Sequence, residues 1–188
     1  AAVSSSHQRG ANKRACILGI LNRETHNNAA YRTASELLPA GKRACEWRAG
    51  DLALRGHAEL LRIRLAKVKA ESESISEEEC NYNDADQAAA RGHLEVVREP
   101  RANGIHCTPA GADWAAAFGH LDILRDLRKH GIHCTENGAN AAAINGHLEA
   151  IRDLRGHGIH CTENGANAAA ENGHLEVVRE LRVQDSIH

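Results

Sequence analysis

The sequence predicts an all-α solenoid of about six stacked helix-turn-helix hairpins. The main observation is a 27-residue period, because the tripeptide Gly-His-Leu begins at residues 92, 119, 146 and 173. A fixed period of about 20 to 50 residues is typical of solenoids built from stacked supersecondary units. The chain is also rich in Ala, and only 3% of its residues are aromatic. Such a composition favours short helices that pack closely through small side chains.

Each regular repeat is expected to form one hairpin, as in the copy that begins at Cys134. Residues 135–138 are predicted to form a turn, and the Ala-rich residues 139–144 a first helix, because Ala has the highest helix propensity. The Asn-Gly pair that follows ends this helix. A second helix is expected from about His147 to Arg155, with its apolar residues on one stripe. One hairpin cannot bury such a stripe alone, so neighbouring hairpins must stack.

The repeats divide the chain into three parts. Residues 1–12 are predicted to be a polar N-terminal arm. Residues 13–79 are expected to hold degenerate helical repeats with an inserted polar segment near 71–79, since the Gly-His pair at residues 56–57 precedes the next pair, at 92–93, by 36 residues instead of 27. Residues 80–188 hold the regular repeats, and the charged last helix indicates a C-terminal cap. The chain does not begin with Met, so we expect a processed or excised chain.

Six cysteines follow the repeat and do not form a typical disulfide framework. Four of them lie 27 residues apart, at Cys80, Cys107, Cys134 and Cys161, and two others precede them. Equivalent positions in packed helices lie roughly 8–10 Å apart, whereas a disulfide requires Cα atoms within about 7 Å. We therefore expect free, buried thiols, which favour a reducing, intracellular compartment such as the cytoplasm.

Charge and hydropathy exclude several classes of partner. The formal net charge is −2, and neither sign forms a block, which disfavours a nucleic-acid-binding tail. No apolar run approaches the roughly 18 residues of a membrane span, and no signal peptide opens the chain. The partner expected from this composition is another protein.

Two segments, residues 89–98 and 170–179, contain Gly-His-Leu-Glu-Val-Val-Arg and resemble the centre of an ankyrin repeat. The resemblance implies a protein-interaction fold. Ankyrin repeats have 33 residues, about six more than these, so the β-hairpin fingers between repeats are expected to be reduced or absent. Shortened arrays of this kind are similar to repeat proteins of large DNA viruses and intracellular microbes, which implies a host cytoplasm or a virion as the location.

The resemblance also implies a structural role for a row of histidines. One histidine opens each second helix, where its ring is expected to bond the loop backbone of a neighbouring repeat. The row consists of His93, His120, His147 and His174.

The recurring His-Cys pairs raise the alternatives of a metal site or a catalytic cysteine. Imidazole and thiolate are zinc ligands, but the next pair along the stack should lie roughly 10 Å away, too far to share one ion. The pairs at residues 106–107, 133–134 and 160–161 are also alike, whereas catalytic sites are normally unique in a chain. We therefore predict no metal, no cofactor and no enzymatic activity.

Positions that vary between repeats are the best candidates for a binding surface. Trp114 and Phe118 lie four residues apart, so they share one face of the first helix in a chain that has few aromatic residues. Such a cluster is a plausible binding hot spot, and the alternative is that these side chains only fill space in the stack. The predicted surface consists of Gln87, Arg91, Trp114, Phe118, Ile144 and Glu171.

Arginines also align from repeat to repeat, and acidic residues alternate with them. Glu95 precedes Arg98 by three residues, a spacing that allows an ion pair within a helix. A solvated, self-compensated face is the simpler interpretation, and an arginine stripe that binds phosphate or an acidic partner is the alternative. Because near-identical repeats have matching ends, end-to-end packing into a filament, shell or other large assembly is a second possible function.

Overall fold

The computed structural model describes residues 48–71, 75–76 and 78–185, which form helices and loops without a strand. This confirms the predicted all-α class and the absence of β-hairpin fingers in this part of the chain. The predicted arm, the first degenerate repeats with Cys16 and Cys45, and part of the predicted insertion lie outside the described residues. The chain divides into two compact units, Ala1–Asn81 and Tyr82–His188.

The first unit contains one described hairpin, formed by α3 (Ala49–Leu54) and α4 (Ala58–Glu71). Beyond α4, Glu79 returns to this hairpin. Its carboxylate accepts hydrogen bonds from the Ala49 N–H at 2.8 Å and from Arg64 Nη2 at 2.9 Å. Burial raises the pKa of Glu79, but these hydrogen bonds outweigh burial and leave the pKa below its usual value. An acidic residue of the predicted insertion thus holds the start of α3.

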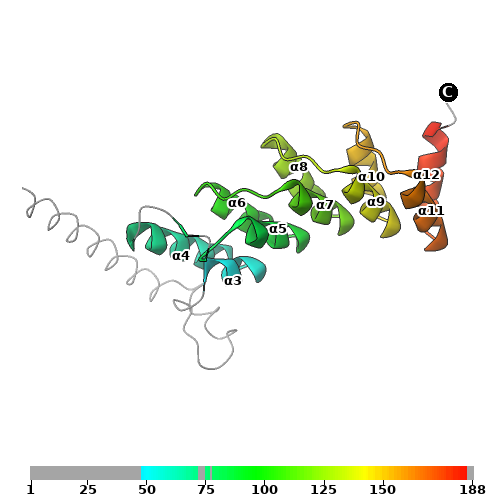
Figure 1. Cartoon of the computed structure of the whole chain (residues 1–188). Helices are drawn as coiled ribbons and strands as arrows, with labels where there is room; N and C mark the ends of the chain where they lie inside the picture. Colours follow the sequence, from blue (N-terminus) through cyan, green and yellow to red (C-terminus); the bar gives the residue numbers. More distant parts are fainter. Residues whose placement is uncertain (1–47, 72–74, 77, 186–188) are drawn as a thin grey trace, which may run out of the picture. The chain divides into compact units, whose positions relative to one another are not determined.

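The second unit is a row of four hairpins in its described residues (Figure 1). First helices pack against first helices and second helices against second helices along the row. The hairpins are α5 (Tyr82–Ala90) with α6 (Leu94–Arg101), α7 (Pro109–Ala117) with α8 (Leu121–Lys129), α9 (Glu136–Ile144) with α10 (Leu148–Arg155), and α11 (Glu163–Glu171) with α12 (Leu175–Asp185).

The first helices begin earlier than the sequence predicts. Residues 136–138, predicted as a turn, form the first turn of α9. A threonine side chain caps two of these helices: the Thr135 hydroxyl accepts a hydrogen bond from the Asn137 N–H at 3.2 Å, and Thr108 does the same for α7. A capping side chain satisfies one of the N–H groups that the first turn leaves without a partner. This bond favours the helix, but α11 begins at the equivalent residue, Glu163, without a side-chain cap from Thr162.

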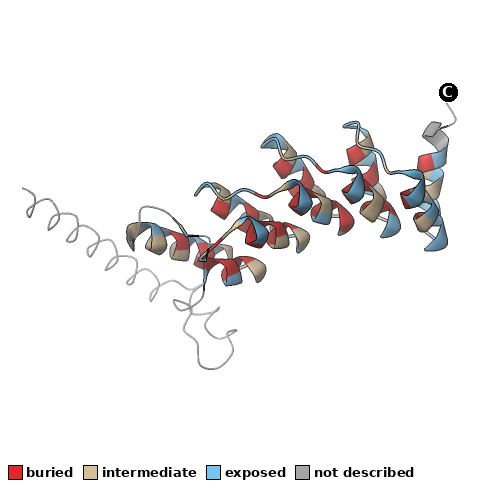
Figure 2. Cartoon of the chain, in the orientation of Figure 1, coloured by how far each residue is buried: buried red, intermediate tan, exposed pale blue. Residues whose placement is uncertain are grey.

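The core lies where successive hairpins face each other (Figure 2). First helices contribute Ala and Gly, and second helices contribute branched residues such as Ile123 and Leu154, which are 1% and 2% exposed. The contact between first helices is close at Gly138 in α9, where an added Cβ would lie 2.7 Å from the Asp113 Cα. A larger residue at this place would push α7 and α9 apart.

Pro100 occupies the α6 position that Leu127 and Leu154 hold in later repeats, and the sequence predicts a kinked or shortened helix there. The shortening does not occur, because α6 has 8 residues, as α10 does. Pro100 is buried in the core. Its ring takes the place of a leucine side chain, and the missing N–H affects only the last turn.

Candidate functional site

An open groove of about 530 Å³ crosses the surface between α5 and α7. Its sides come from α5 with the residue after it, and from α7 with its C-cap residue. Small Ala side chains on both helices leave the space open, and larger side chains border it. The groove is lined by Gln87, Ala90, Arg91, Trp114, Ala117 and Phe118.

Trp114 and Phe118 are exposed although they are the largest apolar side chains of their repeat. Their exposed fractions are 41% and 56%. The opposite face of α7 carries Ala112, Ala115 and Ala116, which are fully buried against the neighbouring helices. Since the inward face already fits the stack with alanines, the aromatic rings lie on the outward face of the helix.

The groove gathers four of the six residues predicted for binding: Gln87, Arg91, Trp114 and Phe118. Ile144 and Glu171 stand at exposed positions in α9 and at the end of α11, but they do not line it. Sequence reasoning missed Ala90 and Ala117, because a small residue signals a groove only once the larger neighbours are placed around it.

Hydrogen bonds from the next repeat fix the backbone beneath the groove. His120 Nε2 lies 3.0 Å from the Ala90 carbonyl oxygen, and Asn145 Nδ2 donates to the Ala117 carbonyl at 2.7 Å. The His120 ring thus contacts the backbone of the preceding repeat at the last residue of α5, where the sequence predicts a contact to a loop. The matching role of Asn145 was not predicted, although Asn172 repeats it on the Ile144 carbonyl.

The histidine rings also occupy the space above a row of glycines. A Cβ on Gly119 would lie 2.6 Å from Nδ1 of His147. Gly119 also has a φ of +74°, a conformation that residues with a Cβ adopt only with strain. Burial lowers the pKa of His147, and the charges of the nearby His120 and His174 lower it further. A hydrogen bond to the Ala117 backbone raises this pKa but does not outweigh the other effects. The neutral ring is thus the form that the stack favours.

The cysteine row consists of free thiols at Cys80, Cys107, Cys134 and Cys161, as predicted. The first three are buried. Burial, and then the negative charge of Asp86, raises the pKa of Cys107 to about 12. Burial and the hydrogen-bonded Asp113 raise the pKa of Cys134 well above its usual range.

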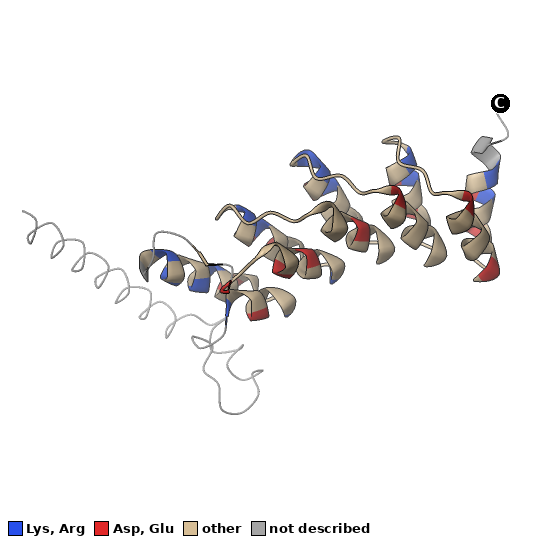
Figure 3. Ribbon diagram, viewed as in Figure 1, with Lys and Arg blue, Asp and Glu red and all other residues tan. Residues whose placement is uncertain are grey.

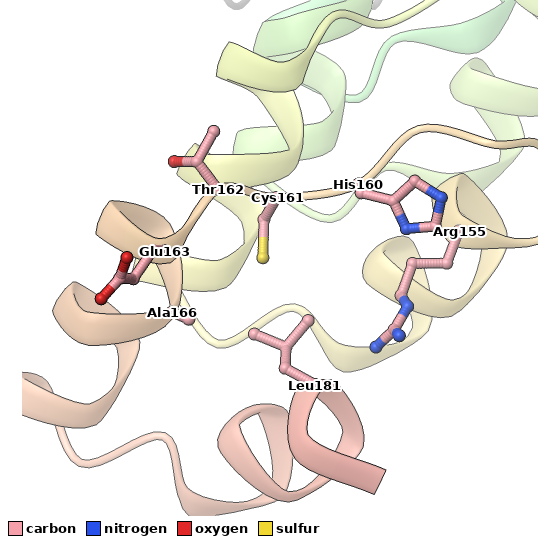
Figure 4. Close-up of a pocket in the computed structure, with 7 residues that line it drawn as sticks. All are labelled: Arg155, His160, Cys161, Thr162, Glu163, Ala166 and Leu181. Carbon is pink, nitrogen blue, oxygen red and sulfur yellow. The ribbon is translucent and has the colours of Figure 1, made fainter. Parts of the chain in front are cut away.

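Cys161 differs from the other three because it is partly exposed. It borders a second hollow, of about 220 Å³, between the last connecting loop, α11 and α12. Figure 4 shows the Cys161 thiol directed into this hollow, with Leu181 on its far side. Other lining residues are Arg155, His160, Thr162, Glu163 and Ala166.

Arginines and acidic residues form ion pairs within and between repeats. Basic residues gather where α6, α8 and α10 lead into the connecting loops (Figure 3). The predicted pairs within a helix are present, for example between Arg98 and Glu95 at 2.9 Å. Arg98 Nε also contacts Asp126 Oδ1 of the next repeat at 3.0 Å.

The interpretation of this surface as a solvated face is wrong for the row of arginines that includes Arg101, and for the acids that this row contacts. Arg101 contacts Asp126 at 2.6 Å, and their side chains are only 13% and 10% exposed. The pattern repeats at Asp153, which contacts Arg125 and Arg128 at 3.0 and 2.8 Å. The 27-residue spacing of the acids was visible in the sequence. The pairing across repeats depends on how far one hairpin is rotated against the next, which the sequence does not give.

Two further observations concern metals and membranes. Among the described residues, no group of three or more His, Cys, Asp or Glu side chains is arranged to hold a metal ion. None of the described helices combines the length and apolar character needed to cross a lipid bilayer.

Comparison with known proteins supports the family resemblance. Residues 112–155, which run from α7 to the end of α10, match the family model described as ankyrin repeats (many copies). No curated protein matches the chain. Residues 112–155 are therefore ankyrin repeats, and the hairpins on either side of them in the second unit share their architecture. Ankyrin repeats are generally protein–protein interaction modules and are typically not enzymes.

Proposed function

We propose that this chain is a non-catalytic interaction module whose α5–α7 groove binds a segment of another protein. The segment presents an apolar side chain to the groove and a carboxylate beside it. The observation that carries the proposal is the exposure of Trp114 and Phe118 on the α7 side of a groove that Ala90 and Ala117 also line.

The apolar part of the proposal rests on the two aromatic rings. A side chain that only filled space in the stack would be buried, whereas Phe118 is 56% exposed. Covering such rings removes apolar surface from water, which stabilises a complex by roughly 25 cal/mol per Å². Aromatic residues and arginine are also enriched among the residues that contribute most to binding.

The charged part rests on Arg91, at the edge of the groove. Arg91 is exposed, and its guanidinium group makes no hydrogen bond or ion pair within the described residues. Arg98 and Arg101 of the following helix instead form ion pairs with Asp126. A guanidinium group with its donors open to solvent can bind a carboxylate through two parallel hydrogen bonds.

Selection from a peptide library tests this proposal. The full chain would serve as bait with Trp47→Phe, so that Trp114 is its sole tryptophan and its fluorescence reports on the groove. We expect selected peptides to combine an aromatic or aliphatic residue with Asp or Glu, and to shift the Trp114 emission to shorter wavelength. Phe118→Ala and Arg91→Glu should each weaken binding at least ten-fold, a change of about 1.4 kcal/mol.

The matched control is Leu175→Ala, which removes an exposed apolar side chain from another helix. This variant should bind the selected peptides as the unmodified chain does. Peptides that bind Phe118→Ala and the unmodified chain equally would show that the groove is not the binding site.

The same proposal places the protein in a reducing compartment such as the cytoplasm. The support is the row of free cysteines, three of them buried, because unpaired thiols persist where glutathione and thioredoxin keep them reduced.

A further inference from the structure

The outward face of the first helices continues beyond the groove to Ile144 in α9. Ile144 holds the same repeat position as Ala90 and Ala117, which line the groove. It is 37% exposed, although α9 lies within the row and packs against both α7 and α11. Ile144 is therefore an apolar side chain on the same side of the row as the groove, one helix further along (Figure 1).

The distance from the groove to the junction of α7 with α9, where Ile144 lies, is set by the helix spacing. A Cβ on Gly111 would lie 3.1 Å from the Asp86 Cα, and one on Gly138, at the equivalent contact, would lie 2.7 Å from the Asp113 Cα. Both junctions between first helices are thus close, and packed helices lie roughly 8–10 Å apart. A ligand that fills the groove and also covers Ile144 must place two side chains about one helix spacing apart.

Only some backbone conformations repeat a side chain at that distance. A polyproline II helix has about three residues per turn and rises about 3.1 Å per residue, so every third side chain points in the same direction and lies about 9 Å further along. A β-strand repeats a face every second residue, which gives about 7 or 13 Å. In an α-helix, residues seven positions apart lie about 10 Å apart. The spacing of the first helices thus fits a polyproline II or an α-helical ligand, and not a strand.

Hydrogen-bond donors beside the groove distinguish these two ligands. The indole N–H of Trp114 and the side-chain amide of Gln87 form no hydrogen bond within the part of the chain that the structure describes, and both residues line the groove. An α-helix uses its carbonyl groups internally, so it would cover these donors without bonding them, which is costly. A polyproline II helix has no internal hydrogen bonds, and its carbonyl groups are open to such donors.

The aromatic side of the groove also suits a polyproline II ligand. Proline-rich segments in this conformation bind grooves that are lined by aromatic side chains, and Trp114 and Phe118 supply such a surface on α7. Because the conformation forms before binding, little backbone entropy is lost when the segment docks. This advantage offsets the modest surface that an open groove covers.

We propose that the ligand of the groove is a polyproline II segment with two apolar residues three positions apart. One apolar side chain enters the groove between α5 and α7, and the other covers Ile144. A carboxylate lies at the opposite end of the segment, beside Arg91, which follows α5 and lines the groove. This inference rests on the proposed function, because it specifies the conformation and register of the segment that the groove binds.

Two synthetic peptides of equal composition test the register. The three-position peptide, Glu-Pro-Pro-Leu-Pro-Pro-Leu, presents both leucines on one side. The two-position peptide, Glu-Pro-Pro-Leu-Pro-Leu-Pro, directs its second leucine away from Ile144. Both are also made in reversed order, so that each chain direction is tested. We expect fluorescence anisotropy of the labelled peptides to show, in one direction, that the three-position peptide binds the full chain about ten-fold more tightly, because it covers one more apolar side chain.

Ile144→Ala isolates the second apolar contact. Alanine stands at this position in the two preceding repeats, so the stack accommodates it. The variant should bind the three-position peptide about ten-fold more weakly and the two-position peptide as before. Leu175→Ala, which removes an exposed apolar side chain from α12, is the matched control and should change neither affinity. Trp114→Phe keeps an aromatic ring but lacks the N–H donor, so it should weaken both peptides.

The proposal is overturned if the two peptides bind equally in both directions, if Ile144→Ala leaves their difference unchanged, or if Trp114→Phe binds them as the unmodified chain does. Absence of saturable binding by the three-position peptide up to about 1 mM would overturn it as well. Phe118→Ala separates this proposal from the proposed function. If it weakens two peptides that bind equally, the groove binds segments of another conformation. If it changes neither affinity, the groove is not the binding site and both proposals fail.

Discussion

Arg101 at the end of α6 and Asp126 in α8 form an ion pair across a repeat junction, with 2.6 Å between Nη2 and Oδ2. Burial raises the pKa of Asp126, but hydrogen bonds and charge from Arg101 and Arg98 outweigh burial and leave the pKa below its usual value. The junction is therefore stabilised by partly desolvated charges as well as by the alanine and leucine contacts around them.

Replacing Asp126 by Asn should destabilise the second unit. The change removes the charge that two arginines bind and leaves the 13% exposed Arg101 side chain without a counter-ion. Hydrogen bonds to charged groups contribute about 1.5–3 kcal/mol, so we expect a loss of about 2 kcal/mol in the free energy of unfolding. Urea denaturation followed by circular dichroism measures it. Asp122→Asn in the same helix is the control, because Asp122 is exposed and has no ion pair within the described residues.

Gly119→Ala should be more destabilising than Gly173→Ala. Both glycines have positive φ, +74° and +78°, so both substitutions introduce similar backbone strain, about 1–2 kcal/mol. The new methyl group at residue 119 would also meet the ring of His147, whereas the one at residue 173 would meet nothing within 4 Å. The difference between the two unfolding free energies measures the cost of moving the ring. Equal losses would show that the ring moves at no cost.

Acidification should destabilise the fold through His147 before it affects the aspartates. The pKa of His147 is lowered in the folded state from 6.5, chiefly by burial. The unfolded chain therefore binds more protons below about pH 6.5, and stability falls as the pH decreases through this range. The lowered pKa values of Asp126 and Asp153 act similarly, but only below their usual value of 3.8.

Unfolding free energies measured between pH 7.5 and 5.5 test the histidine effect. Gln keeps a side-chain donor but cannot take up a proton. His147→Gln should therefore lower the number of protons taken up on unfolding by up to one, and the slope of the unfolding free energy against pH measures this number. An unchanged pH dependence would contradict the lowered pKa.

Cys161 should react with a thiol reagent faster than Cys107 or Cys134. It is partly exposed beside an open hollow, whereas the other two are buried. Burial also raises the pKa of Cys107 to about 12, which leaves little reactive thiolate near neutral pH. Trypsin separates the three cysteines into different peptides, so mass spectrometry after brief iodoacetamide treatment measures each rate in the folded chain. Equal rates would contradict the different burial.

The fold follows from the sequence because a repeat amplifies weak local signals. Residues 139–144 could belong to several structures taken alone, but four copies in register with Gly-His-Leu specify hairpins that must stack. The helix starts were less predictable. Asn137 and Gly138 favour a turn locally, and the cap from Thr135 together with close packing on α7 draws them into α9.

The large residues of the candidate site were predicted from the sequence, and its small residues were not. Trp114 and Phe118 stand out because aromatic residues are rare in the chain, and the structure places both at the groove. Ala90 resembles the other alanines in sequence, and only the position of Arg91 beside it and Trp114 opposite gives it a role. The pairing of Asp126 with Arg101 was missed for a similar reason, since it depends on geometry between repeats.

The equivalence of the junctions has a consequence for how such a protein can change over generations. Residues 131–143 and 158–170 are identical in sequence, and each supplies one hairpin's contacts to the next. Gain or loss of 27 residues by recombination between two such copies would leave every remaining junction with complementary partners. An unequal exchange whose length is not a multiple of 27 residues would break one. Selection can therefore adjust the length of this array in whole repeats without first repairing its fold.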